Sequence, residues 1–101
     1  MRLAHFLSKL GLPDGSAEHM QRYLTQATRY AELCPNDADA FYDLACAAAL
    51  LVMPDLALAS LARAVGLGYR DADWALEDAD LASLRTDLRF TELIDRMRRE
   101  E

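Results

Sequence analysis

Apolar residues recur at steps of three and four along most of this chain, and no segment alternates between apolar and polar residues. Steps of three and four place side chains on one face of an α-helix, whereas a half-buried strand needs a period of two. Ala and Leu dominate and β-branched residues are scarce, which also favours helix. The pattern therefore predicts an all-α fold, and 101 residues suffice for one domain with a modest core.

Turn-forming residues divide the chain into helices. We expect helices over residues 2–10, about 17–33, 38–52 and 55–65, followed by three shorter helical segments after residue 71. Ser16 is a suitable N-cap, Pro54 fits the first turn of a helix, and Gly66 and Gly68 can end one. The segment 38–52 is apolar almost all round, so we expect it to contact neighbours on more than one side.

Eight residues of the segment 36–69 follow a fixed order of large, small and aliphatic side chains: Phe41, Leu44, Ala45, Ala48, Ala57, Leu61, Ala64 and Tyr69. This series resembles the tetratricopeptide repeat (TPR), a family of antiparallel helix-turn-helix repeats that stack into an α-solenoid. Small residues at Ala45, Ala57 and Ala64 would let two antiparallel helices approach closely. The series departs from the family pattern at Tyr69, where proline is typical, and in the turn 52–55, which lacks the common glycine.

The flanking segments match less well. Upstream, the spacing that the family shows in the second helix of a repeat, and the proline that closes it, are kept at Tyr23, Ala27, Tyr30 and Pro35. Downstream, residues 68–71 and 78–90 resemble the closing segment of many bacterial TPR proteins. We therefore expect one helical-repeat domain with three parts: degenerate N-terminal helices in 1–35, the best TPR unit in 36–69 and an irregular helical C-terminal cap in 70–101.

The resemblance also implies a binding surface. In TPR proteins the first helix of each pair lines a concave groove that holds a peptide, and the corresponding residues here are Asp39, Tyr42, Cys46, Ala49 and Leu50. Tyr42 is the best anchor candidate because tyrosine offers a large area and a hydroxyl, although it could instead pack between helices. Family members that bind acidic chaperone C-terminal tails use a clamp of basic residues and asparagines, whereas the matching positions here include Asp39 and Asp43. We therefore expect an apolar or basic partner segment and not a chaperone tail.

The acidic composition disfavours other partners. The formal net charge is −6, and residues 71–101 hold ten of the acids against five bases. Such a chain repels phosphate backbones and anionic lipids, so we expect neither nucleic-acid nor membrane binding. The longest apolar run, over residues 44–53, is too short to cross a bilayer. The N-terminus does not read as a signal peptide, and Cys34 and Cys46 read as free thiols, so we expect a soluble cytoplasmic protein.

Catalytic and metal-binding patterns are missing from the sequence. It contains no phosphate-binding glycine loop and no nucleophile elbow, and His5 and His19 have no ligands at zinc spacing. The segments 71–73 and 78–80 begin like calcium loops but lack the central glycine and the closing glutamate. Their aspartates are better explained as helix caps. We therefore expect no enzyme activity, no cofactor and no metal.

Three functions fit these observations. The first is a protein–protein interaction module, a scaffold or adaptor that holds a partner segment in the concave groove. The second is a self-associating structural or terminal-cap unit, in which the apolar stretch 47–53 packs against a second copy. The third is a small secretion or assembly chaperone, which the acidic composition and small size permit.

Overall fold

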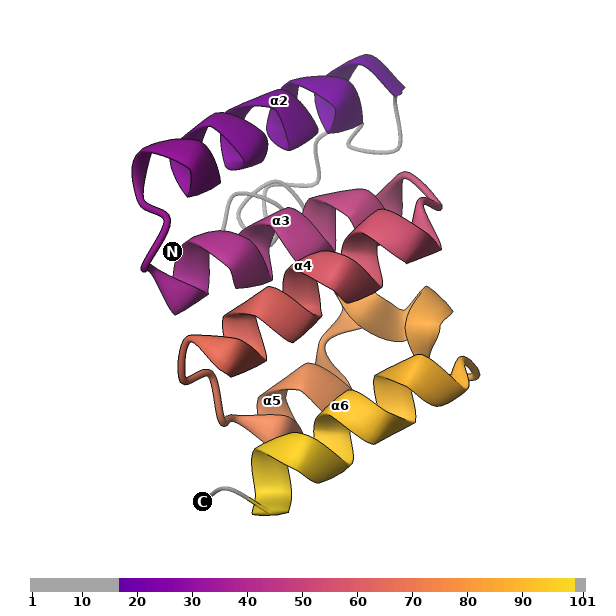
Figure 1. The fold of residues 1–101 in the computed structure, drawn as a ribbon. Helices are drawn as coiled ribbons and strands as arrows, with labels where there is room; N and C mark the ends of the chain where they lie inside the picture. The colour runs from indigo at the N-terminus through magenta and orange to yellow at the C-terminus, as the bar shows by residue number, and fades with distance from the viewer. Residues whose placement is uncertain (1–16, 100–101) are drawn as a thin grey trace.

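The computed structural model describes residues 17–99 and confirms the all-α fold (Figure 1). Its elements are α2 (Ala17–Leu33), α3 (Ala38–Leu50), α4 (Pro54–Gly66), α5 (Ala72–Glu77), the 3-10 helix η1 (Ala79–Leu84) and α6 (Leu88–Arg99). No strand occurs between residues 17 and 99, and no helix in that range is long and apolar enough to cross a membrane. The helix expected over residues 2–10 and the expected cap at Ser16 lie outside the described residues.

Helix α3 lies at the centre of the molecule. It begins at Asp37, whose carboxylate accepts hydrogen bonds from the backbone amides of Asp39 and Ala40 at 2.9 and 3.4 Å. It packs against α2, α4 and η1, which confirms that this apolar segment contacts neighbours on several sides (Figure 1). Its alanines therefore serve more than one interface, and Ala45, Ala47 and Ala48 are fully buried.

Helices α3 and α4 each end in a turn with the same pattern of hydrogen bonds. At the end of α3 the amides of Met53 and Val52 donate to the carbonyls of Ala48 and Ala49, at 2.9 and 3.0 Å. At the end of α4 the amides of Tyr69 and Gly68 donate to Ala64 and Val65 at 3.0 and 3.1 Å. This pattern is the Schellman motif, whose central residue takes a left-handed conformation. Gly68 does so with φ 114°, as glycine readily can, but α3 uses a valine, Val52, with φ 57°.

The core has two parts that share α3. A smaller cluster joins α2 to α3 through Tyr23, Ala27, Ala31, Ala40, Leu44 and Ala47. A larger cluster joins α3 and α4 to α5, η1 and α6, and its largest fully buried side chains include Leu61, Leu81, Leu84, Phe90 and Met97. Ala57 and Ala64 are completely buried in the larger cluster, as expected for small residues between close-packed helices.

The C-terminal segment folds back over the α3–α4 hairpin in two ways. Its first part, α5 and η1, turns sharply at Asp78 and brings η1 against α3, while α6 lies beside α4 and runs in the same direction (Figure 1). The expected aspartate caps are confirmed here. Asp71 accepts from the amide of Trp74 at 3.0 Å, and Asp78 accepts from the amide of Asp80 at 3.0 Å.

Candidate functional site

The five residues expected to line a groove differ in exposure. Asp39 is exposed and Leu50 is half-buried, but Tyr42, Cys46 and Ala49 are buried. Residues 69–84 of the same chain cover this face of α3, because η1 packs on α3 and the rings of Tyr42 and Tyr69 stack with centroids 4.4 Å apart. That these five residues bind a partner stays a prediction, and as the chain stands only Asp39 and part of Leu50 offer surface.

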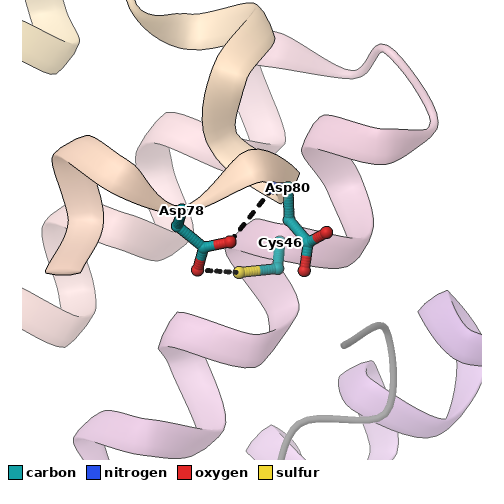
Figure 2. Close-up of side chains that lie close together, drawn as sticks. All are labelled: Cys46, Asp78 and Asp80. Atoms are coloured by element: carbon teal, nitrogen blue, oxygen red, sulfur yellow. Dashed lines mark hydrogen bonds between the residues drawn. The ribbon is translucent and has the colours of Figure 1, made fainter. Parts of the chain in front are cut away.

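Beneath this cover lies a buried polar cluster centred on Asp78 (Figure 2). Its Oδ2 accepts from the Tyr42 hydroxyl at 2.8 Å and from the Cys46 thiol at 3.8 Å, and its Oδ1 accepts from the Asp80 amide. Burying a carboxylate is costly unless hydrogen bonds replace its water. These donors from α3 and η1 supply that replacement, so the cluster fastens η1 to α3.

The Tyr42 hydroxyl is held in its protonated form. Burial is the main cause that raises its pKa, and the neighbouring Cys46, Tyr69 and Asp78 raise it further. The phenol therefore stays a hydrogen-bond donor at any ordinary pH, which is the form that a buried carboxylate acceptor requires.

Cys46, Asp78 and Asp80 are also the residues that come nearest to a metal-ligand set in the described part of the chain. Each residue offers one atom that could bind a metal ion, these three atoms lie within 4.8 Å of one another, and all three residues are buried. A structural zinc site uses four ligands, and Asp78 already accepts three hydrogen bonds in this arrangement. A cation would have to displace them, so we interpret the cluster as structural.

Charge is divided between the helices. The elements α3, α5 and η1 contain no Lys, Arg or His, and their charged residues are Asp39, Asp43, Asp73, Glu77 and Asp80. The arginines of the described helices all belong to α2, α4 and α6. Of these five acids, Asp39 and Glu77 are exposed and form no ion pair within residues 17–99, whereas the exposed Asp73 pairs with Arg98 of α6 at 3.3 Å. The basic residues of the described helices are therefore confined to α2, α4 and α6, which leaves α3, α5 and η1 with negative charge alone.

Asp39 and Glu77 each lie within three residues of the Tyr42–Asp78 hydrogen bond, which joins α3 to the C-terminal segment. Asp39 is on the same face of α3 as Tyr42, three residues on, and Glu77 directly precedes Asp78, to which Tyr42 is bonded. Trp74 shares a face of α5 with Glu77 and is 42% exposed. We call Asp39, Trp74 and Glu77 the acidic surface.

A groove of about 470 Å³ lies between α4 and α6. It is lined from α4 by Asp55, Leu58, Ala59 and Ala62, and from α6 by Arg89, Glu92, Leu93, Arg96 and Arg99. Sequence reasoning did not find this groove, because it depends on α4 and α6 lying side by side. The available signal was the pair Arg96 and Arg99, one helical turn apart near the end of an otherwise acidic segment.

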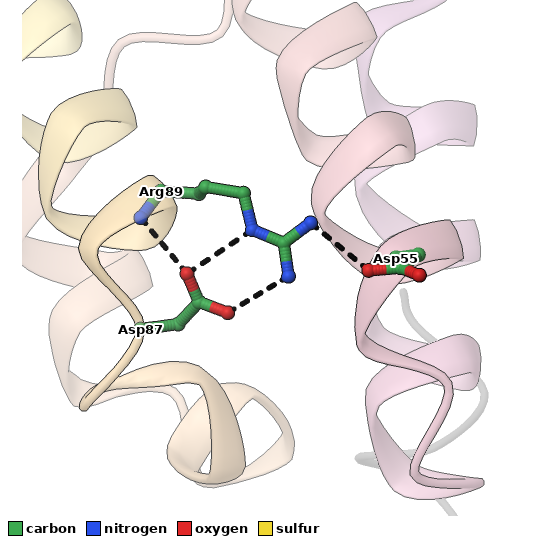
Figure 3. Close-up of polar contacts among 3 residues, drawn as sticks. All are labelled: Asp55, Asp87 and Arg89. Carbon is green, nitrogen blue, oxygen red and sulfur yellow. Dashed lines mark hydrogen bonds and ion pairs between the residues drawn. The ribbon is translucent and has the colours of Figure 1, made fainter.

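Arg89 ties the two walls of the groove together at one end (Figure 3). Its guanidinium contacts Asp87 at 2.9 Å and reaches across to Asp55 of α4, also at 2.9 Å. The hydrogen bonds to Asp87 and then to Asp55 raise the pKa of Arg89, and the bond from Arg89 lowers the pKa of Asp87. All three groups reach solvent, so this link fixes the position of α6 more than it adds stability.

Comparisons of the chain with models of known families, with curated proteins and with solved structures found no match. The resemblance to TPR proteins therefore rests on the residues of the segment 36–69. The features that can contact a partner are the acidic surface and the groove between α4 and α6.

Proposed function

We propose that this protein is a cytoplasmic protein-interaction module of the TPR kind, which holds an apolar or basic segment of another protein on its acidic surface. The observation that carries the proposal is the absence of any basic residue from α3, α5 and η1, although the chain has 11 Lys and Arg residues. Such a division of charge directs a basic partner to one side of the molecule.

The acidic surface offers the groups that a basic segment needs. Trp74 is an exposed aromatic residue that can stack on the stem of a Lys or Arg side chain and attract its charge, and Glu77 on the same face can pair with that charge. Asp39 supplies a second carboxylate across the contact with α3. Trp74 thus takes the anchoring role that the sequence analysis gave to Tyr42, which is buried.

The test uses three sets of 15-residue peptides that share one apolar face and differ only in their polar positions, which are Lys, Ser or Glu. Binding is measured by fluorescence anisotropy. The test variant carries Asp39→Asn and Glu77→Gln, and the control variant carries Asp95→Asn and Glu32→Gln, which are exposed acids of α6 and α2. Both variants lose one Asp and one Glu, so their net charges are the same.

We expect the Lys peptides to bind best, because they complement the acidic surface. Two exposed charge contacts of about 0.5 kcal/mol each predict that the test variant binds them about five times more weakly, with little change in the control. Adding Trp74→Ala should weaken binding further. The proposal is wrong if Lys and Glu peptides bind equally, or if both variants lose the same affinity, since the effect would then be one of net charge alone.

Self-association is a second candidate, favoured by an exposed apolar tip. Val52, Met53 and Leu56 at the α3–α4 turn are exposed, and Val52 is 77% exposed. Leu88, 78% exposed, directly precedes Arg89, whose guanidinium bonds to Asp55 in the first turn of α4. Sedimentation over a wide concentration range tests this function. A dimer that Val52→Ser dissociates would support it, and a monomer at all concentrations would exclude it.

A further inference from the structure

We propose that residues 2–10 of this chain are a ligand of its own acidic surface and cover that surface until a partner displaces them. The inference rests on the proposed function, because it names what occupies the same site when no partner is bound. The affinity of the protein for a basic segment is then set by competition with its own residues, which makes the contact autoinhibitory.

Segment 2–10 has the chemistry that the acidic surface is proposed to bind. It lies outside the described residues, and its sequence predicts a helix whose apolar residues share one face: Leu3, Phe6, Leu7 and Leu10. Arg2 and Lys9 are seven positions apart, about two helical turns, so a helix carries both bases along one side. The segment contains no Asp or Glu. It is therefore an apolar and basic segment within the chain itself.

The carboxylates that would receive its charge are not neutralised by their neighbours. Asp39 and Glu77 are exposed and form no ion pair within residues 17–99, and the positions three and four residues from either one hold no Lys, Arg or His. Arg85 approaches this region, because it donates to the backbone carbonyl of Asp78 at 3.5 Å, and it offsets one of the two charges. The region stays acidic, so charge complementarity favours a segment with two bases.

Helix α3 offers one continuous face for such a segment. Asp39, Asp43 and Leu50 follow one another at steps of four and seven, so their side chains lie on the same side of α3. Asp39 is exposed, whereas Asp43 and Leu50 are half-buried. The face is therefore acidic toward its first end and apolar toward its last, and it can take the bases and the leucines of an amphipathic helix together.

The connection to α2 is long enough to bring the segment there. Helix α2 runs antiparallel to α3, and the Tyr23 hydroxyl donates to the Asp43 carbonyl at 3.3 Å (Figure 1). The start of α2 at Ala17 therefore lies toward the Leu50 end of α3. Residues 11–16 span up to about 20 Å when extended, and a helix over residues 2–10 measures about 12 Å. The distance from Leu50 back to Asp43 is about 10 Å along α3, so one docked helix covers it.

Tethering makes a weak contact sufficient. A short flexible connection gives a tethered segment an effective concentration in the millimolar range. Segment 2–10 is then docked in most molecules if its own dissociation constant lies below about 1 mM. Two exposed charge contacts correspond to about a fivefold change in that constant, so removing both bases releases much of the docked segment.

The variants are made in the full-length chain. The first is Arg2→Gln with Lys9→Gln, and its control is Arg29→Gln with Arg99→Gln, which are exposed bases of α2 and α6 and give the same change in net charge. Leu7→Ser tests the apolar face without changing the charge. Circular dichroism establishes that each variant is folded.

Trp74 reports on the docked segment without any partner. It is the single tryptophan of the chain and belongs to the acidic surface, so its fluorescence senses what covers that surface. We expect Arg2→Gln with Lys9→Gln, and also Leu7→Ser, to increase the quenching of Trp74 by acrylamide and to shift its emission to longer wavelength. The control variant should give the quenching of the wild type.

The second readout is the affinity for the Lys peptides. Arg2→Gln with Lys9→Gln should bind them about three times more tightly than the wild type, because the competing segment is weakened. The fivefold loss expected for Asp39→Asn with Glu77→Gln counts the contacts of the peptide alone. These two substitutions also release the segment, so the loss is about twofold in the wild-type background and about fivefold when Arg2→Gln and Lys9→Gln are present.

The outcomes separate this inference from the proposed function. The inference is overturned if the segment variants leave the quenching of Trp74 and the Lys-peptide affinity unchanged, or if the control changes both as much. A fivefold loss for Asp39→Asn with Glu77→Gln in both backgrounds likewise overturns it and leaves the proposed function standing. Segment variants that expose Trp74 while no Lys peptide binds support docking of segment 2–10 and refute the proposed function alone.

Discussion

Replacing Val52 by glycine should stabilise the protein, although it removes a hydrophobic side chain. Val52 has φ 57°, a left-handed conformation that costs an L-residue about 1–2 kcal/mol and that a β-branched residue rarely takes. Glycine adopts it without that cost but loses about 0.5–1 kcal/mol of backbone entropy on folding. Val52 is 77% exposed, so little buried apolar area is lost. The net expectation for Val52→Gly is a gain of about 1 kcal/mol in the free energy of unfolding.

The end of α4 provides the reverse experiment. Gly68 occupies the same position in the same Schellman motif with φ 114°, and no atom lies within 4 Å of the Cβ that a larger residue would add. Gly68→Val should therefore destabilise the protein through backbone strain alone, by about 1–3 kcal/mol. The control Val52→Ala keeps a Cβ in the left-handed region, so it should recover only a small part of the gain seen with Val52→Gly.

Urea unfolding followed by far-UV circular dichroism measures all three free energies, and a gain of 1 kcal/mol should raise the melting temperature by about 5 °C in a domain of this size. The reasoning fails if Val52→Gly is less stable than the wild type. It also fails if Val52→Ala is as stabilising as Val52→Gly, because the gain would then come from removing exposed apolar surface.

Three further predictions concern the contacts that position the helices. Tyr42→Phe removes the donor to buried Asp78 and should cost about 2 kcal/mol in urea unfolding. The fold raises the pKa of Tyr42, so its hydroxyl contributes fully to the free energy of unfolding at any pH below its unfolded pKa of about 10, and this contribution is lost as the pH rises further. The wild type should therefore lose stability above pH 10 more steeply than Tyr42→Phe. Arg89→Gln should lower stability less than Tyr42→Phe, and about 1 M salt should abolish the difference from the wild type, since the pair with Asp55 is exposed. Leu61→Ala should cost about 2–5 kcal/mol, because Leu61 is fully buried.

The sequence predicted local structure well because local rules decide it. The helices, the proline at the start of α4 and the caps at Asp71 and Asp78 all follow from residues a few positions apart. The end of α3 was expected at residue 52 but falls at Leu50. Val52 takes the left-handed position that usually needs glycine, and a sequence pattern reads a valine there as one more helical residue.

The long-range contacts could not be read from spacing. Tyr42 was open to two interpretations, a groove anchor or a residue packed between helices, and both have the same position on α3. Its burial is decided by Asp78 and Tyr69, 36 and 27 residues further along the chain, and no periodicity connects those segments. Asp78 or Asp80 was expected as a cap, and Asp78 is the one that caps η1. Its second role, as the acceptor for Tyr42, depends on where the turn after α5 places it.

Two contacts between residues far apart in the sequence hold the acidic surface and the α4–α6 groove in position. The Tyr42–Asp78 hydrogen bond fixes the end of α5 beside α3, which sets Glu77 relative to Asp39. The Arg89–Asp55 pair fixes α6 beside α4, which sets the width of the groove at the end where these two helices begin. A surface that is held in place before its partner arrives loses less entropy on binding. Tyr42→Phe should therefore weaken binding to the acidic surface even though Tyr42 is too deeply buried to touch a partner, and it should leave the α4–α6 groove unaffected.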